Sequence, residues 1–155
     1  MTELKTPGYG DFGNLSKQYD EARHGFPDEA IQFLWSLIEN PHPSVLDLGC
    51  GTGISTRQLS RPGIQLSGSD KDPEMIKLAK EKGPADIMYV VAPANHMSFK
   101  DAQFDVITAF SAFHWFSDKE SVSEVRRILK PTGIFFVVNK NDVGDFKKGY
   151  KEVLK

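Results

Sequence analysis

A glycine-rich stretch that follows an acid is the first place in this sequence where residue types and spacing indicate chemistry. Within VLDLGCGTGIST, residues 45–56, Gly49, Gly51 and Gly53 come directly after a short apolar run that contains Asp47. Glycine permits a tight turn and a close approach between the backbone and a ligand. A helix beginning after the turn would point its free amide donors at the same ligand. The alternative, a tight turn without a ligand, stays open on these residues alone.

A second acid, Asp70, stands where the next apolar run ends, in IQLSGSD. In doubly wound α/β proteins, an acid at the end of the second strand accepts hydrogen bonds from the hydroxyls of an adenosine ribose. The glycine stretch and Asp70 together therefore predict an adenosine compound as ligand. The alternatives are that Asp70 caps the following helix or lies in a solvated loop, and Asp72 competes for the capping role.

The spacing of the glycines narrows the class of adenosine compound. Dinucleotide sites carry G-x-G-x-x-G, whereas here the pattern is G-x-G-x-G, and Ile54 stands where the third glycine belongs. The triphosphate loop G-x-x-x-x-G-K-[ST] is absent from the sequence. A nicotinamide-dependent oxidoreductase and a nucleoside triphosphate site are both disfavoured.

A run of aromatic residues, FSAFHWF, begins at the end of the fourth apolar segment. Phe110 and Phe116 are favoured as core residues, whereas Phe113 and Trp115 have the alternative of bordering an acceptor pocket or facing a cation. His114 is the best-placed candidate for a general base. A structural histidine stacked beside Trp115 is an equal alternative.

Alternating strands and helices must position these residues. Apolar spacing and stop signals predict helices at 27–40, 54–60 and 73–82, and a further helix that starts at a capping box of Ser117 and Glu120 and ends at Pro131-Thr132-Gly133. Buried strands are predicted at 44–49, 64–70, 87–91, 104–110 and 134–139. The expected fold class is α/β, a Rossmann-like, doubly wound, mostly parallel sheet with helices on both faces.

The composition fits one globular domain. The chain has 155 residues, 39% apolar and 26% charged, and its formal net charge of -2 gives no general attraction to nucleic acid or to an anionic membrane. No signal core or apolar run of ~18 residues is visible, so we expect no membrane span and a cytoplasmic location. A single cysteine, Cys50, and four scattered histidines indicate neither a disulfide nor a metal site.

Four segments resemble, in order and spacing, the class I S-adenosylmethionine-dependent methyltransferases. VLDLGCGTG resembles their first motif, SGSDKDPEMIKLAK their second, FDVITAFSAFHWF their fourth strand with its exit loop, and EVRRILKPTGIFFVV the helix and strand that end the family's core. The resemblance runs from about Tyr19 to Asn139. Within the family, YDEARHGFPDEAIQFL and FHWF are similar to the small-molecule branch that includes trans-aconitate methyltransferases. The resemblance implies S-adenosylmethionine as cofactor, S-adenosylhomocysteine as product and a small-molecule acceptor.

The resemblance also implies roles for individual residues. Backbone at Gly49 and Gly51 would contact the amino-acid end of S-adenosylmethionine, Asp47 would orient its ammonium directly or through water, and Asp70 would bind the ribose. The wider cofactor-binding set that the resemblance implies is Tyr19, Arg23, Cys50, Gly53, Lys71, Met75, Ala94, Asn95 and Phe110, with Lys71 and Met75 beside the adenine.

The sequence departs from the family pattern after the third strand. Relatives commonly show an acid and then AE there, whereas this chain has Ala92-Pro93-Ala94-Asn95. The carbonyl of the Asn95 amide can still accept from the adenine amino group, and Ala94 can still donate its backbone N–H. Cofactor binding is therefore expected, but weakened.

Methyl transfer is an in-line displacement in which a neutral thioether leaves, so positioning can supply most of the acceleration, roughly 7–11 kcal/mol. Phe113, His114 and Trp115 form the expected acceptor site. A hydroxyl or amine acceptor would use a base, for which His114 is the candidate, and a carboxylate acceptor needs none. Tyr19 and Arg23, four residues apart on one helix face, resemble residues that close over the methionine carboxylate, and a solvated surface pair is the alternative.

We expect one S-adenosylmethionine-binding domain over 1–155, with 1–26 as an N-terminal lid segment and 140–155 as the start of a truncated C-terminal part. The family's C-terminal antiparallel strands are not expected here, which would leave the fifth strand with an open edge and a route to self-association. The leading hypothesis is a methyltransferase acting on a small molecule. The alternative is a non-catalytic binding module or a fragment of a longer methyltransferase. A nucleic-acid methyltransferase is disfavoured because no NPPY-like element follows the fourth strand.

Overall fold

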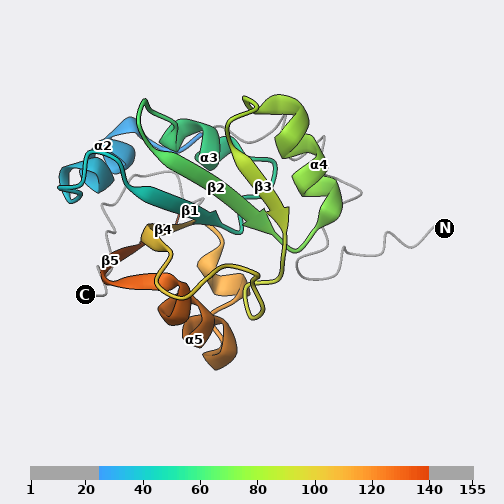
Figure 1. Cartoon of the computed structure of the whole chain (residues 1–155). Coiled ribbons are helices and arrows are strands. Elements are labelled where there is room, and N and C mark those ends of the chain that lie inside the picture. The colour runs from blue at the N-terminus through green and yellow to red at the C-terminus, as the bar shows by residue number, and fades with distance from the viewer. Residues whose placement is uncertain (1–24, 140–155) are drawn as a thin grey trace.

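Five apolar runs of the sequence form the strands of one sheet (Figure 1). In the computed structural model, which describes residues 25–139, the strands are β1 Ser44–Leu48, β2 Gln65–Asp70, β3 Met88–Val91, β4 Phe104–Phe110 and β5 Leu129–Val138. Their order is β3-β2-β1-β4-β5, and every neighbouring pair is parallel. The predicted α/β fold class is confirmed, and no antiparallel strand occurs within residues 25–139.

Helices cover both faces of the sheet (Figure 1). They are α2 Asp28–Ser36, α3 Ile54–Leu59, α4 Pro73–Lys82 and α5 Lys119–Ile128, with a short 3-10 turn, η2, at Phe113–Trp115. Side chains of α2, α3 and α4 pack in one apolar cluster and those of α5 in a second cluster on the opposite face. Along β1, Val45 belongs to the first cluster and Leu46 to the second, and both are fully buried. No helix in this part of the chain is long and apolar enough to cross a membrane.

The parallel arrangement decides where a site can form. Parallel strands need a crossover between one strand and the next, so their carboxyl ends all meet at the same edge of the sheet. β1 lies in the middle, with β2 and β4 on its two sides, so the chain reverses its direction of winding at β1. Loops that follow β1, β2, β3 and β4 therefore converge at one edge, where ligands bind in this class of fold.

Helix boundaries differ from the predicted ones in three places, one of which is the end of α5 at Ile128, before the predicted stop. The helix predicted over 27–40 ends at Ser36, because the chain turns there, with the Leu37 N–H on the Leu34 carbonyl at 3.0 Å. The N-terminal cap of α5 is Asp118, not Ser117, because the Asp118 carboxylate accepts from both the backbone N–H and the hydroxyl of Ser121, at 2.9 and 2.8 Å. The predicted position of the helix cap was therefore wrong by one residue.

The fifth strand begins earlier than predicted, at Leu129. Leu129 has an extended backbone and pairs with Phe104 immediately after α5, and after a shift of register Ile134 pairs with Val106. Pro131-Thr132-Gly133, predicted to separate the helix from the strand, lie within the irregular part of the strand instead. Pairing with β4 on both sides of these residues decides the boundary, and that pairing is invisible in local sequence.

Candidate functional site

A pocket of about 230 Å³ lies at the carboxyl edge of the sheet. It is lined by Phe26 and by residues 48–52, 54–55, 70–72, 75, 92–95, 110–112, 115–116, 118 and 121. Apart from Phe26, these residues end or follow β1, β2, β3 and β4, or lie at the start of α5, so the segments after four strands contribute to one cavity. A concave site where several loops meet is the usual kind of place for a small molecule or cofactor in this class of fold.

The glycine loop is a pocket wall made of backbone. The N–H groups of Gly49 and Cys50 donate to the Ser69 carbonyl at 2.8 and 2.9 Å, which ties the loop to the end of β2. Gly49 and Gly51 have φ of 69° and 54°, in the left-handed region that favours glycine. A Cβ on Gly49 would lie 2.8 Å from the Cβ of Ala112, whereas a Cβ on Gly51 would meet nothing within 4 Å. Gly49 lets two walls of the pocket pack together, and Gly51 leaves space inside it.

The other two predicted residues of this loop are placed differently. Cys50 lines the pocket, but its thiol is buried, and burial with the nearby carboxylates of Asp47 and Asp70 raises its pKa well above the usual range. The thiol is therefore protonated and a poor nucleophile at neutral pH. Gly53 does not line the pocket: it precedes α3 with φ of 82°, and a Cβ there would lie 2.6 Å from the Tyr89 hydroxyl oxygen.

Asp47 lies beneath the loop and not in the pocket wall. Its carboxylate is fully buried and accepts from the hydroxyls of Ser55 and Thr56, both at 2.7 Å, and of Thr108, at 2.8 Å. Burial raises the pKa of this carboxyl, and the three hydroxyl donors oppose that shift. Asp47 is absent from the pocket lining, so its side chain joins the start of α3 to the centre of the sheet.

Asp70 lies in the pocket wall and also braces the loop. One carboxylate oxygen accepts from the Gly51 N–H at 2.9 Å, and the other accepts from the Asp72 N–H at 3.0 Å. Burial raises the pKa of Asp70, and these two amide donors oppose the shift. The carboxylate of Asp72 accepts from the Glu74 N–H at 2.9 Å. Asp72, and not Asp70, is therefore the N-terminal cap of α4.

The turn after β3 forms the facing wall, with Ala94 and Asn95 among its lining residues. The Ala92 N–H donates to the Asp70 carbonyl at 2.9 Å, which extends the β2–β3 pairing by one bond. The His96 N–H donates to the Pro93 carbonyl at 3.1 Å and closes the turn. The buried Met75 and the exposed Lys71 line the pocket from α4 and the residues before it.

The aromatic run after β4 divides between the pocket and the core. Trp115 and Phe116 line the pocket, and so does Phe110. Phe113 does not: its ring packs edge-on against Phe135 and Phe116, with centroids 5.5 and 5.9 Å apart. His114 is exposed, lies outside the lining and contacts Trp115, with ring centroids 4.7 Å apart and the rings tilted by 42°. Three of the aromatic residues therefore form pocket wall, and the imidazole contacts one of them from outside the lining.

Two predicted site residues, Tyr19 and Arg23, lie outside the described residues. The sequence analysis also missed several residues that line the pocket. Phe26 reaches the pocket because the Gln58 side chain binds both its backbone N–H and its carbonyl, at 2.8 and 2.9 Å. No spacing rule predicts that contact across 32 residues. Asp118, also missed, carried a visible signal as a helix cap.

Comparisons with known proteins agree with this geometry. Residues 46–137 match the family described as Methyltransferase domain. The chain is 32% identical over 143 residues to 2-methyl-6-phytyl-1,4-hydroquinone methyltransferase of Synechocystis sp., an alignment that covers 88% of this chain and 44% of that protein. It is 30% identical over 122 residues to a methyltransferase of Mycobacterium tuberculosis, covering 79% and 49%. The crystal structure of the YcgJ protein from Bacillus subtilis aligns with a TM-score of 0.64 at 32% identity, covering 73% of this chain and 51% of that one. The chain spans about half the length of the relatives that it matches.

Proposed function

The chain belongs to the class I S-adenosylmethionine-dependent methyltransferases, and from that premise we propose that its pocket binds S-adenosylmethionine and presents the methyl group to a small-molecule acceptor. The observation that carries the proposal is the position of the Asp70 carboxylate in the pocket wall, beside the glycine-rich loop. A carboxylate offers about four acceptor positions. Asp70 uses two of them on backbone amides and keeps capacity for two ribose hydroxyls.

The pocket also fits the cofactor in shape and charge. The space over Gly51, which a Cβ would enter, suits a ligand that approaches the backbone closely. Three carboxylates line the cavity, those of Asp70, Asp72 and Asp118, against the ammonium of Lys71 among the described residues. This balance favours a ligand that carries a sulfonium and an ammonium over one that carries phosphates. S-Adenosylmethionine, when bound, supplies an activated methyl group.

The chain's own residues would bind the cofactor, orient it and shield it from solvent. Gly49 and Gly51 would face the amino-acid end, and Asp70 the ribose. Asp47 would act through the loop, because its hydrogen bonds to Ser55 and Thr56 fix the start of α3 under that loop.

On the adenine side, Lys71 and Met75 would flank the ring, the Asn95 carbonyl would accept from its amino group and Ala94 would offer its N–H. Phe110 and Cys50 complete the apolar lining. Holding both reactants in line is the main catalytic contribution expected of such a site.

The acceptor would enter beside the aromatic wall. Phe26, Trp115 and Phe116 line the pocket with apolar surface, which favours an acceptor with an apolar or aromatic body. The hydroquinone substrate in the name of the Synechocystis relative has a ring of that kind. His114 contacts Trp115 from outside the lining, so we propose that it supports the indole ring in preference to acting as a base. A non-catalytic binding module remains the competing function, and it would share the cofactor site.

A calorimetric titration tests the cofactor assignment. The chain is titrated with S-adenosylmethionine, S-adenosylhomocysteine and NAD, alongside Asp70→Ala and the matched control Asp86→Ala, an exposed acid outside the pocket lining. We expect saturable binding of both adenosyl ligands, loss of that binding in Asp70→Ala only, and no binding of NAD. Equal affinity in Asp70→Ala and the unaltered chain would overturn the proposal. Release of S-adenosylhomocysteine on addition of phenolic acceptors would separate an enzyme from a binding module.

A further inference from the structure

The segment 92–103, between β3 and β4, forms part of the pocket wall without any helix or strand of its own. Its first residues line the pocket and its remaining residues run beneath α5. A wall built from irregular backbone is only as well placed as the contacts that hold it, because no ladder of hydrogen bonds fixes its shape. The question is which contacts hold this one.

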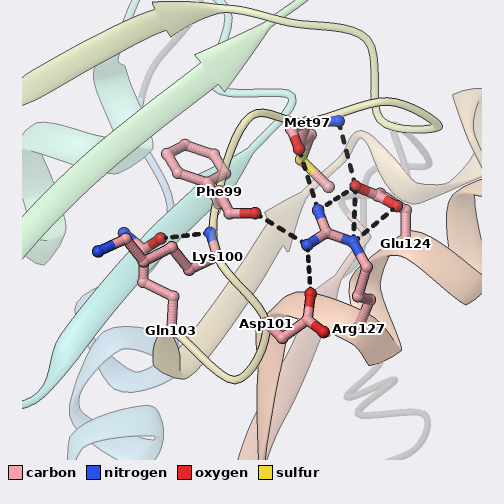
Figure 2. A network of polar contacts seen from close by, with 7 residues as sticks. All are labelled: Met97, Phe99, Lys100, Asp101, Gln103, Glu124 and Arg127. Carbon is pink, nitrogen blue, oxygen red and sulfur yellow. Dashed lines mark hydrogen bonds and ion pairs between the residues drawn. The ribbon is translucent and has the colours of Figure 1, made fainter.

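The guanidinium of Arg127 is the centre of those contacts (Figure 2). One terminal nitrogen donates to the Met97 carbonyl at 3.0 Å, and the other donates to the Phe99 carbonyl at 2.9 Å and to the Asp101 carboxylate at 2.7 Å. Glu124, one turn earlier on α5, accepts from the same guanidinium and also accepts from the Met97 N–H at 3.2 Å. Both backbone groups of Met97 are therefore held by this one ion pair.

The backbone of α5 adds to these side-chain contacts. The Ala102 N–H donates to the Arg127 carbonyl and the Gln103 N–H donates to the Ile128 carbonyl, both at 2.8 Å. Met97 is also buried against the apolar cluster that includes Val125. The end of the segment thus continues into β4 with its position already set by α5.

The pocket part of the segment lies between two anchors. At one end, the Ala92 N–H is bound to the Asp70 carbonyl at 2.9 Å. At the other end, Met97 is bound to Glu124 and Arg127, only two residues beyond Asn95. Between these two anchors, the backbone hydrogen bond that the structure describes is that of a local turn, from the His96 N–H to the Pro93 carbonyl. The second anchor therefore decides where Asn95 stands relative to the rest of the pocket.

The same helix supports a second wall. Asp118 and Ser121, in the first turn of α5, line the pocket, and Arg127 is in the last turn. A contact between Arg127 and the segment 92–103 thus fixes two pocket walls relative to each other. We propose that Arg127 is a positioning residue, which sets the affinity and base selectivity of the cofactor pocket by holding the carbonyls of Met97 and Phe99. The inference rests on the proposed function, because it takes the adenine to lie beside this wall.

An arginine is required by the geometry of its partners. The planar guanidinium presents five donors in a fixed fork, so it reaches two carbonyls and two carboxylates at once, whereas a lysine ammonium is a compact charge with three donors. Replacement by lysine should keep the charge and some of the contacts, and replacement by methionine should keep only the apolar stem. The neighbouring Arg126 is exposed and makes none of the contacts of Arg127, so it provides a matched control.

The test compares Arg127→Met, Arg127→Lys and the control Arg126→Met with the unaltered chain. For each, calorimetry gives the Kd of S-adenosylhomocysteine and of its deaminated analogue S-inosylhomocysteine, at a temperature well below every melting point. A displaced wall would hold the adenine less well through Asn95 and Ala94, and each lost hydrogen bond raises Kd by up to about tenfold. We therefore expect Arg127→Met to weaken S-adenosylhomocysteine roughly ten- to hundredfold and to reduce the adenosyl-to-inosyl preference. Arg127→Lys should be intermediate and Arg126→Met unchanged.

The ratio of the two affinities separates positioning from simple destabilisation, because a fraction of unfolded protein lowers both equally. A folded Arg127→Met with unchanged affinity and unchanged ratio would overturn the inference. If Arg127→Met does not fold, the same two measurements on Arg127→Lys, the affinity for S-adenosylhomocysteine and the ratio of the two affinities, test the inference. Failure of the unaltered chain to bind S-adenosylhomocysteine would refute the proposed function and this inference together, whereas binding that Arg127→Met and Arg127→Lys leave intact would refute the inference alone.

Discussion

Asp47 and Thr108 are paired across the two central strands, and the Thr108 hydroxyl donates to the Asp47 carboxylate at 2.8 Å. Both side chains are fully buried. The same carboxylate accepts from Ser55 and Thr56, so β1, β4 and α3 meet at one acid directly below the glycine loop. A buried carboxylate that is satisfied by hydroxyls alone fixes backbone geometry without offering its charge to the pocket.

The burial of Asp47 predicts a pH-dependent difference in stability. Burial raises its pKa, so at pH values between the ordinary aspartate pKa of 3.8 and the folded pKa the folded state holds a proton that the unfolded state has lost. The stability it contributes is fully present below pH 3.8 and is lost as the pH rises through the folded pKa. The free energy of unfolding of the unaltered chain should therefore fall relative to that of Asp47→Asn from pH 4 upward and then level off. Urea denaturation from pH 4 to 8 measures this difference, and a difference that is constant across the range would contradict it.

Gly49 and Gly51 should respond differently to alanine. In both variants, an alanine in the left-handed backbone conformation would cost about 1–2 kcal/mol of stability. Only in Gly49→Ala would the new Cβ also lie too close to neighbouring side chains, 2.8 Å from the Ala112 Cβ and 3.0 Å from a ring carbon of Phe116. Overpacking adds about 1–3 kcal/mol, so Gly49→Ala should unfold at lower urea. Gly51→Ala should lose affinity for S-adenosylhomocysteine out of proportion to its stability, because its Cβ enters the pocket. Equal urea midpoints for the two variants would refute the packing argument.

Two buried serines should give opposite results. The Ser69 hydroxyl is buried and has no hydrogen-bond partner within residues 25–139, so Ser69→Ala should be neutral or stabilising by about 1 kcal/mol. The Ser55 hydroxyl donates to the Asp47 carboxylate at 2.7 Å, and Ser55→Ala should cost about 1.5–3 kcal/mol because that acceptor is charged. Thermal denaturation of the two variants side by side checks the signs, and destabilisation by Ser69→Ala would reveal a bound partner for that hydroxyl.

Substitutions of His114 and Trp115 should differ in their effect on cofactor binding. Trp115 lines the pocket, whereas the exposed His114 lies outside the lining, so Trp115→Ala should weaken S-adenosylhomocysteine binding. His114→Ala should change that binding by no more than about twofold, as surface substitutions do. Calorimetry with both variants compares the two. Should a turnover assay with an active acceptor show a loss of about 10²-fold or more for His114→Ala, the imidazole would be a general base after all.

The sequence by itself determined the elements and the location of the site. Apolar runs of strand length, helical spacing and glycine and proline stops are local signals, so the α/β fold class, the positions of β1 to β4 and the loop after β1 followed from them. Asp70 could be assigned to the pocket because an acid at the end of a parallel strand has a predictable place. These inferences need no knowledge of what packs against what.

Only the tertiary structure decided which side chains line the pocket and which lie behind its wall. Asp47 and Asp70 look alike in sequence, yet one is covered by three hydroxyls from α3 and β4 and the other lies in the pocket wall. Phe113 turns to Phe135 while Trp115 lines the cavity. Arg127, a charged residue in an ordinary helix, holds a loop about 30 residues away. Such contacts depend on the pairing of distant segments, because hydrogen-bonding capacity and burial are settled only when the sheet brings those segments together.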